Sequence, residues 1–209
     1  MKDIPIFTTQ YGVASLALGK IPYGGCAYIH VRSVAEGMLD AHVNECADFC
    51  RAVGAEHIFW TAEEAHRPPH SIIYEMRGHP PKNPDLLACL FPVTEQTAAK
   101  WRQIHNERMQ QVDHAAYLTA ADEKKLLNPG AYFIHREGKL LGIGWLEDDC
   151  IRALAAVEPG AGETVARTLL SLTEGTVRLE VVSTNTRAIR LYEKLGFVKT
   201  RELRRWYQV

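Results

Sequence analysis

The segment from Ser183 to Phe197 constrains the fold of this chain more than any other part of the sequence. Thr184 or Asn185 can cap a helix at its start, because side-chain oxygens of both types accept hydrogen bonds from the first turn. Gly196 stands where helices end in the left-handed conformation, and Phe197 opens the next strand. The helix between them has a stripe of side chains at three- and four-residue spacing, which are Ala188, Leu191, Tyr192 and Leu195. The segment therefore predicts a capped helix that packs on a core and leads into a strand.

The rest of the second half predicts strands and helices in mixed order. Alternating apolar residues and turn signals predict the strands. They cover Leu90–Val93, Tyr132–His135, Leu140–Leu146, Cys150–Val157, Val177–Ser183, Gly196–Arg201 and Leu203–Tyr207. Apolar residues at helical spacing predict the helices. One helix is predicted directly after Thr94, and three others over Ala115–Leu127, Glu163–Leu172 and Arg187–Leu195.

The first half has its own pattern of elements. Strands are predicted within 5–18 and 25–34, a helix over 35–53, and strands over 57–61 and 71–76. The segment Gly78–Pro84 holds three prolines and a glycine, which cannot continue a helix or a central strand. We therefore expect a linker there, with domains at residues 1–85 and 86–209.

Composition excludes several classes of function. The chain has 209 residues, of which 46% are hydrophobic, and a formal net charge of -1, so no global field favours nucleic acid or an anionic membrane. The first ten residues do not resemble a signal peptide, and no apolar run is long enough to span a membrane, so we expect a cytoplasmic protein. The five cysteines include no CxxC pair, and Cys46 and Cys50 lack a matching ligand pair, so we expect free thiols and no metal.

The helix segment resembles a known family motif. Six residues match the second cofactor motif of the GNAT superfamily of N-acetyltransferases, N-x-x-A-x-x-x-Y-x-K-x-G-F; these are Asn185, Ala188, Tyr192, Lys194, Gly196 and Phe197. The resemblance covers about Leu90 to Val209. It implies an α/β (α+β) fold, with a GNAT-like mixed and twisted sheet flanked by helices. Residues 1–85 then form a smaller α/β half, which we interpret as a degenerate partial GNAT copy.

The family's other motif supplies the diphosphate site and is altered in this chain. The motif normally reads V-x-P, then Arg or Gln, then two glycines that open a helix, whose free N–H groups hold the phosphates. Here Val157-Glu158-Pro159 is followed by Gly160-Ala161-Gly162, with no Arg or Gln in place. Two interpretations stay open. Either the small residues still bind the diphosphate through their backbone N–H groups, or the site has lost most or all of its affinity for coenzyme A. Glu163 is unfavourable for binding, since a carboxylate competes with phosphate for the helix dipole.

The resemblance implies an activity and a set of site residues. The activity is transfer of an acetyl group from acetyl-CoA to a primary amine of an unidentified small-molecule or peptide acceptor. Tyr192 is the implied general acid, and Asn185 the residue that binds the pantetheine arm. The implied coenzyme-binding residues are Ala155, Val157, Gly160, Ala161, Gly162, Glu163, Thr164, Asn185, Ala188 and Tyr192.

Other functional questions remain open from the sequence. No general base stands out; Asp148, Asp149, Glu158 and Glu180 are the acidic residues near the motifs. The basic residues from Arg187 onward could attract a phosphorylated cofactor or form a solvated face. A non-catalytic acyl-CoA-binding or sensing module is the alternative function, motivated by the altered loop. The sequence also leaves open whether the protein forms a homodimer.

Overall fold

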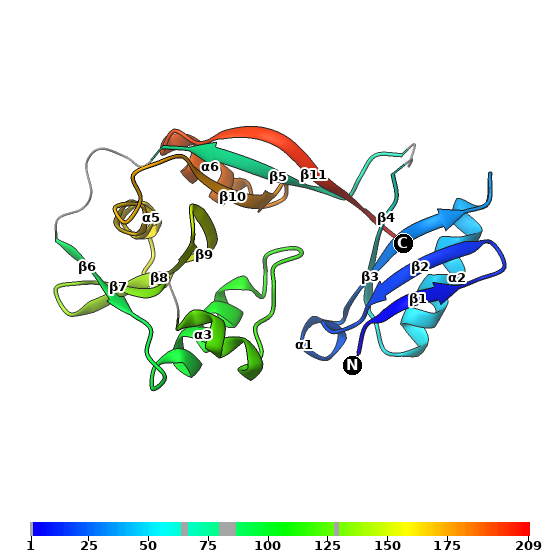
Figure 1. Ribbon diagram of the computed structural model, residues 1–209, viewed down its shortest axis with the longest axis horizontal. Coiled ribbons are helices and arrows are strands. Elements are labelled where there is room, and N and C mark those ends of the chain that lie inside the picture. The colour runs from blue at the N-terminus through cyan, green and yellow to red at the C-terminus, as the bar shows by residue number, and fades with distance from the viewer. Residues whose placement is uncertain (1, 64–66, 80–86, 128–129) are drawn as a thin grey trace. The chain divides into compact units, whose positions relative to one another are not determined.

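A computed structural model describes residues 2–63, 67–79, 87–127 and 130–209. Its chain forms two compact units, which we describe separately (Figure 1). The first unit consists of Met1–Ile72 with Leu203–Val209, and the second of Ile73–Glu202. This division differs from the boundary expected at residue 85, because the second unit already begins at Ile73 and the segment Leu203–Val209 belongs to the first unit. The expected linker at Gly78–Pro84 lies mostly outside the described residues.

The first unit is a sheet with one long helix packed on it. Its sheet order is β1-β2-β3-β4, followed by the end of β11. The elements are β1 (Ile4–Thr8), β2 (Gly12–Ala17), α1 (Ile21–Gly24), β3 (Cys26–Val34), α2 (Leu39–Ala52) and β4 (His57–Thr61). Apolar residues of α2, such as Val43 and Cys46, share a core with Trp60 of β4 and with Tyr207. The rings of Trp60 and Tyr207 stack at 4.6 Å.

The second unit contains the larger sheet, in the order β6-β7-β8-β9-β10-β5 and then the start of β11. Its strands are β5 (Ser71–Gly78), β6 (Ala88–Pro92), β7 (Ala131–Arg136), β8 (Lys139–Glu147), β9 (Cys150–Ala156), β10 (Val177–Val182) and β11 (Val198–Gln208). Its helices are α3 (Ala98–Met109), η1 (Ala120–Asp122), α4 (Glu123–Leu126), α5 (Gly162–Leu170) and α6 (Thr186–Lys194). The architecture is a mixed, curved sheet flanked by helices, as the sequence predicts.

The helices of the second unit cover both faces of its sheet. Residues of α5 and α6, among them Leu169 and Tyr192, form one core with the sheet. Residues of α3 and α4, among them Trp101 and Leu126, form a second core with other sheet residues, and Figure 1 shows α3 on the other side of the sheet from α5 and α6. Helix α5 lies close to β8, since a Cβ atom at Gly144 would come within 2.8 Å of the Leu169 side chain. This close packing holds the last turn of α5 against β8.

The two units repeat one pattern of elements. In the first, the antiparallel strands β1-β2-β3 are followed by α2 and by β4, which is parallel to β3. In the second, the antiparallel strands β7-β8-β9 are followed by α5 and by β10, which is parallel to β9. Each last strand then pairs with an antiparallel strand, β11 in the first unit and β5 in the second. This repetition agrees with the interpretation of the first half as a partial copy.

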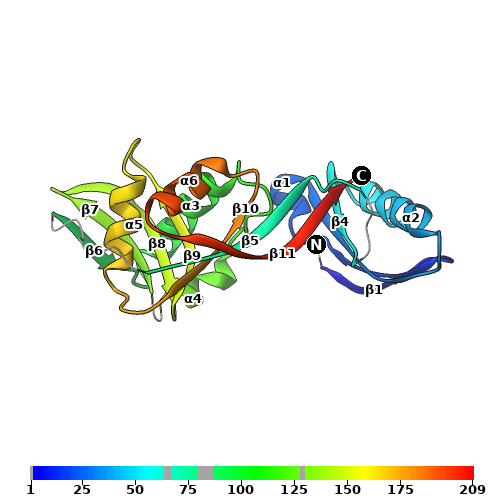
Figure 2. The same ribbon diagram turned by 90° about the horizontal axis from the view of Figure 1, so that it is seen from above.

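Two sequence predictions about elements were wrong. Strands were expected at Gly196–Arg201 and Leu203–Tyr207, but β11 runs without a break through Glu202, because its two parts pair with different units (Figure 2). The helix expected over Ala115–Leu127 is reduced to η1 and the single turn of α4. A capping box between Thr119 and Asp122 starts this short piece late.

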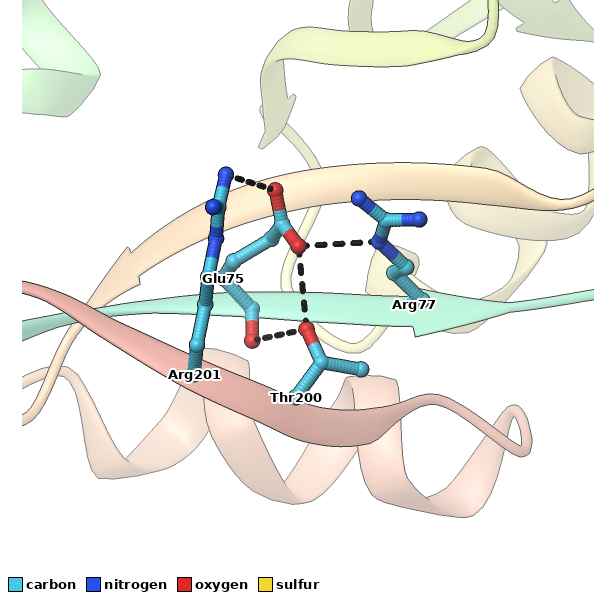
Figure 3. A network of polar contacts seen from close by, with 4 residues as sticks. All are labelled: Glu75, Arg77, Thr200 and Arg201. Atoms are coloured by element: carbon cyan, nitrogen blue, oxygen red, sulfur yellow. Dashed lines mark hydrogen bonds and ion pairs between the residues drawn. The ribbon is translucent and has the colours of Figure 1, made fainter.

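A buried carboxylate joins β5 to β11 within the second unit (Figure 3). Glu75 is only 4% exposed, and its carboxylate accepts hydrogen bonds from Arg77 Nε at 2.8 Å and Arg201 Nη2 at 3.2 Å. Thr200 Oγ1 lies 3.0 Å from the same carboxylate and 3.2 Å from the Glu75 carbonyl oxygen. The bond from Arg77, with those from Thr200 and the charge of Arg201, lowers the pKa of Glu75 to about 2. These contacts fix β5 against β11.

The described residues carry no helix long and apolar enough to cross a membrane. The five cysteines all lie in the described residues and form no disulfide. Burial raises the pKa of Cys46 to about 12 and that of Cys50 to about 11, so both thiols stay protonated at neutral pH. Reactive thiolates are not expected at this pair.

The Glu75 network predicts a pH-dependent stability. A carboxyl whose pKa is lower in the folded protein stabilises the fold above its unfolded pKa, and this contribution is lost as pH falls through the folded pKa. We expect the melting temperature to fall between about pH 4.5 and about pH 2, partly through Glu75. In Glu75→Gln the part of this fall in melting temperature that is due to Glu75 should be missing. The melting temperature at neutral pH should also be lower, since Arg77 and Arg201 lose the carboxylate that they bind.

Thermal melts from pH 2 to pH 7 test this expectation, with Glu174→Gln as the control. Glu174 is an exposed carboxylate in the turn before β10. An unchanged acid slope in Glu75→Gln would show that Glu75 does not couple folding to pH.

Candidate functional site

The sheet of the second unit splits between its two adjacent parallel strands. Strands β9 and β10 pair only at Cys150 with Arg178 and at Ile151 with Leu179, although both strands continue further. The neighbouring β8–β9 pairing contains a bulge that leaves Arg152 as the extra residue on β9. A bulge bends its strand and ends regular pairing. The sheet therefore opens toward the carboxyl ends of β9 and β10.

A cavity of about 210 Å³ lies at this split. Residues Arg152–Leu154 of β9 and Leu179–Val182 of β10 line it, together with the end of α3, the loop at Val112–Ala116 and the start of α6. Helices α5 and α6 both begin after these strands, so their N-terminal ends lie at the same edge of the sheet. Parallel sheets bind ligands in crevices at this edge. The cavity is the candidate functional site.

Tyr192 and Asn185 reach this cavity from α6. The Tyr192 side chain is 7% exposed, and burial raises its pKa to about 12, so its hydroxyl stays protonated at neutral pH. No hydrogen bond joins this hydroxyl to another described residue. Asn185 is the N-cap of α6, since its Oδ1 accepts a hydrogen bond from the Ala188 backbone N–H at 3.1 Å. The structure thus assigns the cap to Asn185, and Tyr192 offers an unpaired donor to the cavity.

The other end of the cavity comes from segments that the sequence analysis did not connect with the site. His105 of α3 is buried and donates from Nε2 to the Ala116 carbonyl oxygen at 3.1 Å. Asp113 accepts a hydrogen bond from the Thr184 hydroxyl at 2.8 Å, which ties the loop after α3 to the start of α6. Arg152 and Glu180 also line the cavity. Of these four, the sequence analysis named only Glu180, because periodicity does not show which loop lies across a sheet.

The altered loop after Pro159 lies at the start of α5 and outside the cavity lining. Gly160 has a φ of 82°, and space around it is open. Ala161 is the N-cap of α5 and provides no side-chain cap, so the first N–H groups of the helix lack a capping side chain. The Val157 carbonyl oxygen accepts a hydrogen bond from Arg108 of α3 at 3.1 Å. Of the ten predicted coenzyme-binding residues, the cavity lining includes Asn185, Ala188 and Tyr192.

Glu163 forms ion pairs with two cationic side chains near the start of α5. Its carboxylate pairs with Lys194 of α6 at 2.5 Å and with Arg167, one turn further along α5, at 3.0 Å. The bonds from Lys194 and then Arg167 lower the pKa of Glu163. Further along the basic run, Lys199 pairs with Glu193 and Arg201 with Glu75. Lys194, Lys199 and Arg201 of the basic run noted in the sequence therefore each have an acidic partner.

Comparisons with solved structures place the fold among acetyltransferases. A GCN5-related N-acetyltransferase from Anabaena variabilis superposes with a TM-score of 0.57 and 12% identity, over 95% of this chain and 59% of that protein. A GCN5-related N-acetyltransferase from Kribbella flavida superposes with a TM-score of 0.53 and 12% identity, over 97% of this chain and 58% of that protein. A conserved protein of unknown function from Staphylococcus epidermidis gives a TM-score of 0.55 and 10% identity, over 97% of this chain and 91% of its own length.

These likenesses show the GNAT fold that the sequence motif predicts. This chain spans less than two thirds of the length of the two named acetyltransferases. No protein-family model and no curated protein matches the sequence.

Proposed function

We propose that this protein is an N-acetyltransferase that moves an acetyl group from acetyl-CoA to a primary amine. The observation that carries the proposal is the protonated, unpaired Tyr192 hydroxyl in the cavity where β9 and β10 separate. The GNAT fold supports it, since the named structural neighbours with that fold are N-acetyltransferases.

The residues at the split suit a thioester substrate. A strand edge without a partner offers backbone N–H and C=O groups, which can bind the amide-containing arm of the coenzyme. The part of β9 after Ile151 and the part of β10 after Leu179 are such edges. The acetyl group would then lie in the cavity, within reach of α6.

Tyr192 is proposed to donate the proton that the leaving thiolate needs. When the amine attacks the thioester carbon and the carbon–sulfur bond breaks, the sulfur carries the negative charge and must be protonated. A phenol with a pKa near 12 is fully protonated at neutral pH and gives up its proton only to a strong base nearby. Mere binding of coenzyme A would not need such a donor, which favours the enzyme over the sensing module.

Glu163 is the main argument for the alternative function. The diphosphate of the coenzyme would approach the start of α5, where Glu163 already pairs with Lys194 and Arg167. A bound diphosphate must displace this carboxylate or lie beside it, and both cost affinity through like-charge repulsion. A non-catalytic module with weak acyl-CoA binding is therefore the second candidate.

The first prediction concerns coenzyme binding. We expect acetyl-CoA to raise the melting temperature of the protein, because a ligand that binds only the folded state stabilises it. At about 100 times the dissociation constant the gain is roughly 2.7 kcal/mol, or about 5–10 °C for a chain of this size. Differential scanning fluorimetry with acetyl-CoA and with dephospho-CoA measures this shift. No shift at millimolar acetyl-CoA would remove both the enzyme and the sensing module.

A second prediction concerns Tyr192→Phe. The variant keeps the ring and its packing against Phe197, at 5.9 Å between centroids, but loses the hydroxyl. We expect kcat to fall roughly 100-fold while the affinity for acetyl-CoA stays nearly constant. Steady-state kinetics with an acceptor found by screening, together with calorimetry, separate these two quantities. Turnover equal to that of the native enzyme would exclude Tyr192 as the acid.

A third prediction concerns Glu163→Gln. Removing the carboxylate frees Lys194 and Arg167 for phosphate and ends the repulsion at the helix start. We expect the dissociation constant for acetyl-CoA to fall roughly 3- to 10-fold. This range corresponds to a gain of about 1 kcal/mol when the unfavourable charge at the helix end is removed. Isothermal titration calorimetry checks this, with Glu174→Gln as a control that removes a distant carboxylate. Weaker binding in Glu163→Gln would mean instead that Glu163 holds the two cations in place for the coenzyme.

A further inference from the structure

Most polar side chains of the cavity in the second unit are occupied by protein partners. Asp113 binds Thr184, Arg152 pairs with Glu147 at 2.7 Å, and Asn185 caps α6. Two side chains differ. Glu180 and Tyr192 line the cavity, and no hydrogen bond or ion pair joins either of them to another described residue.

Glu180 lies at the point where the sheet opens. It follows Leu179, the last residue of β10 that pairs with β9. On the other side, Glu180 lies opposite Glu75 of β5 and shares a sheet face with Ile73 and Val182, which also line the cavity. The strand register therefore directs the Glu180 side chain to the cavity face, and its side chain is exposed.

The environment of Glu180 leaves its negative charge available to a ligand. The neighbouring carboxylate of Glu75 is bound to Arg77 and Arg201. Arg152 lies near enough for Glu180 to help raise its pKa, but the Arg152 guanidinium is bound to Glu147. A carboxylate that faces a cavity and forms no ion pair or hydrogen bond with another described residue is suited to bind an ammonium ion.

His105 is the other candidate base at the cavity. Its Nε2 donates to the Ala116 carbonyl oxygen, which leaves Nδ1 as an unpaired acceptor. This atom has almost no accessible surface, because the ring stacks on Trp101 at an interplanar angle of 11°. An amine cannot reach Nδ1 without moving that stack, whereas Glu180 is open to the cavity.

We infer that Glu180 binds the acceptor amine as its ammonium ion and takes its proton. This inference rests on the proposed acetyl transfer. One N–H proton moves to the Glu180 carboxylate, and the freed lone pair forms the new carbon–nitrogen bond at the thioester carbon. The carbon–sulfur bond breaks, and the thiolate takes the Tyr192 proton. A second proton from the nitrogen restores the phenol, so one ammonium ion and one thioester give an amide, a thiol and one released proton.

The role of Glu180 predicts a difference between two kinds of acceptor. Benzylamine is an ammonium ion at neutral pH and needs a base, whereas aniline is already neutral. For Glu180→Gln we expect kcat/KM to fall roughly 100-fold with benzylamine and by less than about fivefold with aniline. Glu180→Asp should recover part of the loss, since it restores a carboxylate. The shift of the melting temperature by acetyl-CoA should be unchanged in both variants.

The test uses the full chain with acetyl-CoA, both amines, and Glu174→Gln as the control. Equal losses with benzylamine and aniline would overturn the inference, because a purely structural defect affects both alike. Native activity in Glu180→Gln would overturn it too, while the proposed function would stand. If the native protein binds acetyl-CoA but acetylates neither amine nor any amine of a broader screen, the proposed enzyme fails and Glu180 has no catalytic role.

Discussion

The separation of β9 from β10 is the constraint on which the rest of the candidate site depends. Two parallel strands that begin as partners stop pairing after Ile151 and Leu179, because a bulge at Arg152 bends β9 away. Unpaired strand edges in a protein interior are costly unless a ligand or solvent satisfies them. The split therefore creates the cavity and leaves backbone N–H and C=O groups that a ligand or solvent can satisfy. In the first unit, β3 and β4 pair over five residue pairs, from Cys26 with His57 to His30 with Thr61, so the corresponding place is closed.

The repeated pattern of the two units is linked by strand exchange. Strand β5 follows the first repeat in the sequence but pairs with β10, and the end of β11 follows the second repeat but pairs with β4. Neither repeat has a complete sheet from its own continuous sequence. The buried Glu75, held by Arg77, Thr200 and Arg201, secures this arrangement inside the second unit. Through this connectivity the first half of the sequence supplies β5, the strand that borders β10.

Polar side chains are paired at the start of α5, but some in the cavity have no partner among the described residues. Lys194 and Arg167 lie beside the start of α5, where we propose that the diphosphate binds, yet both of them pair with the Glu163 carboxylate. The pair of bonds stabilises the start of α5 in the absence of ligand, since a carboxylate interacts favourably with the helix dipole. The cavity shows the reverse arrangement, because Tyr192 and Glu180 are left without protein partners. We interpret the first as a feature that limits affinity and the second as the reactive part of the site.

The sequence by itself determined the local elements and the α6 motif. Asn185 caps α6, Tyr192 is buried and Gly196 has a positive φ, all as their spacing predicts, because capping and helix ends depend on neighbours a few residues away. Phe197 instead precedes the next strand, since β11 begins at Val198. The sequence did not determine that β11 is one strand, that 115–127 is mostly irregular, or that Asp113 and His105 lie at the site, since these depend on contacts between distant segments. Glu180 shows the difference most clearly. Its place on a strand was predicted from alternation, but only the tertiary structure, through the register with Glu75 and the end of pairing with β9, decided that it faces a cavity.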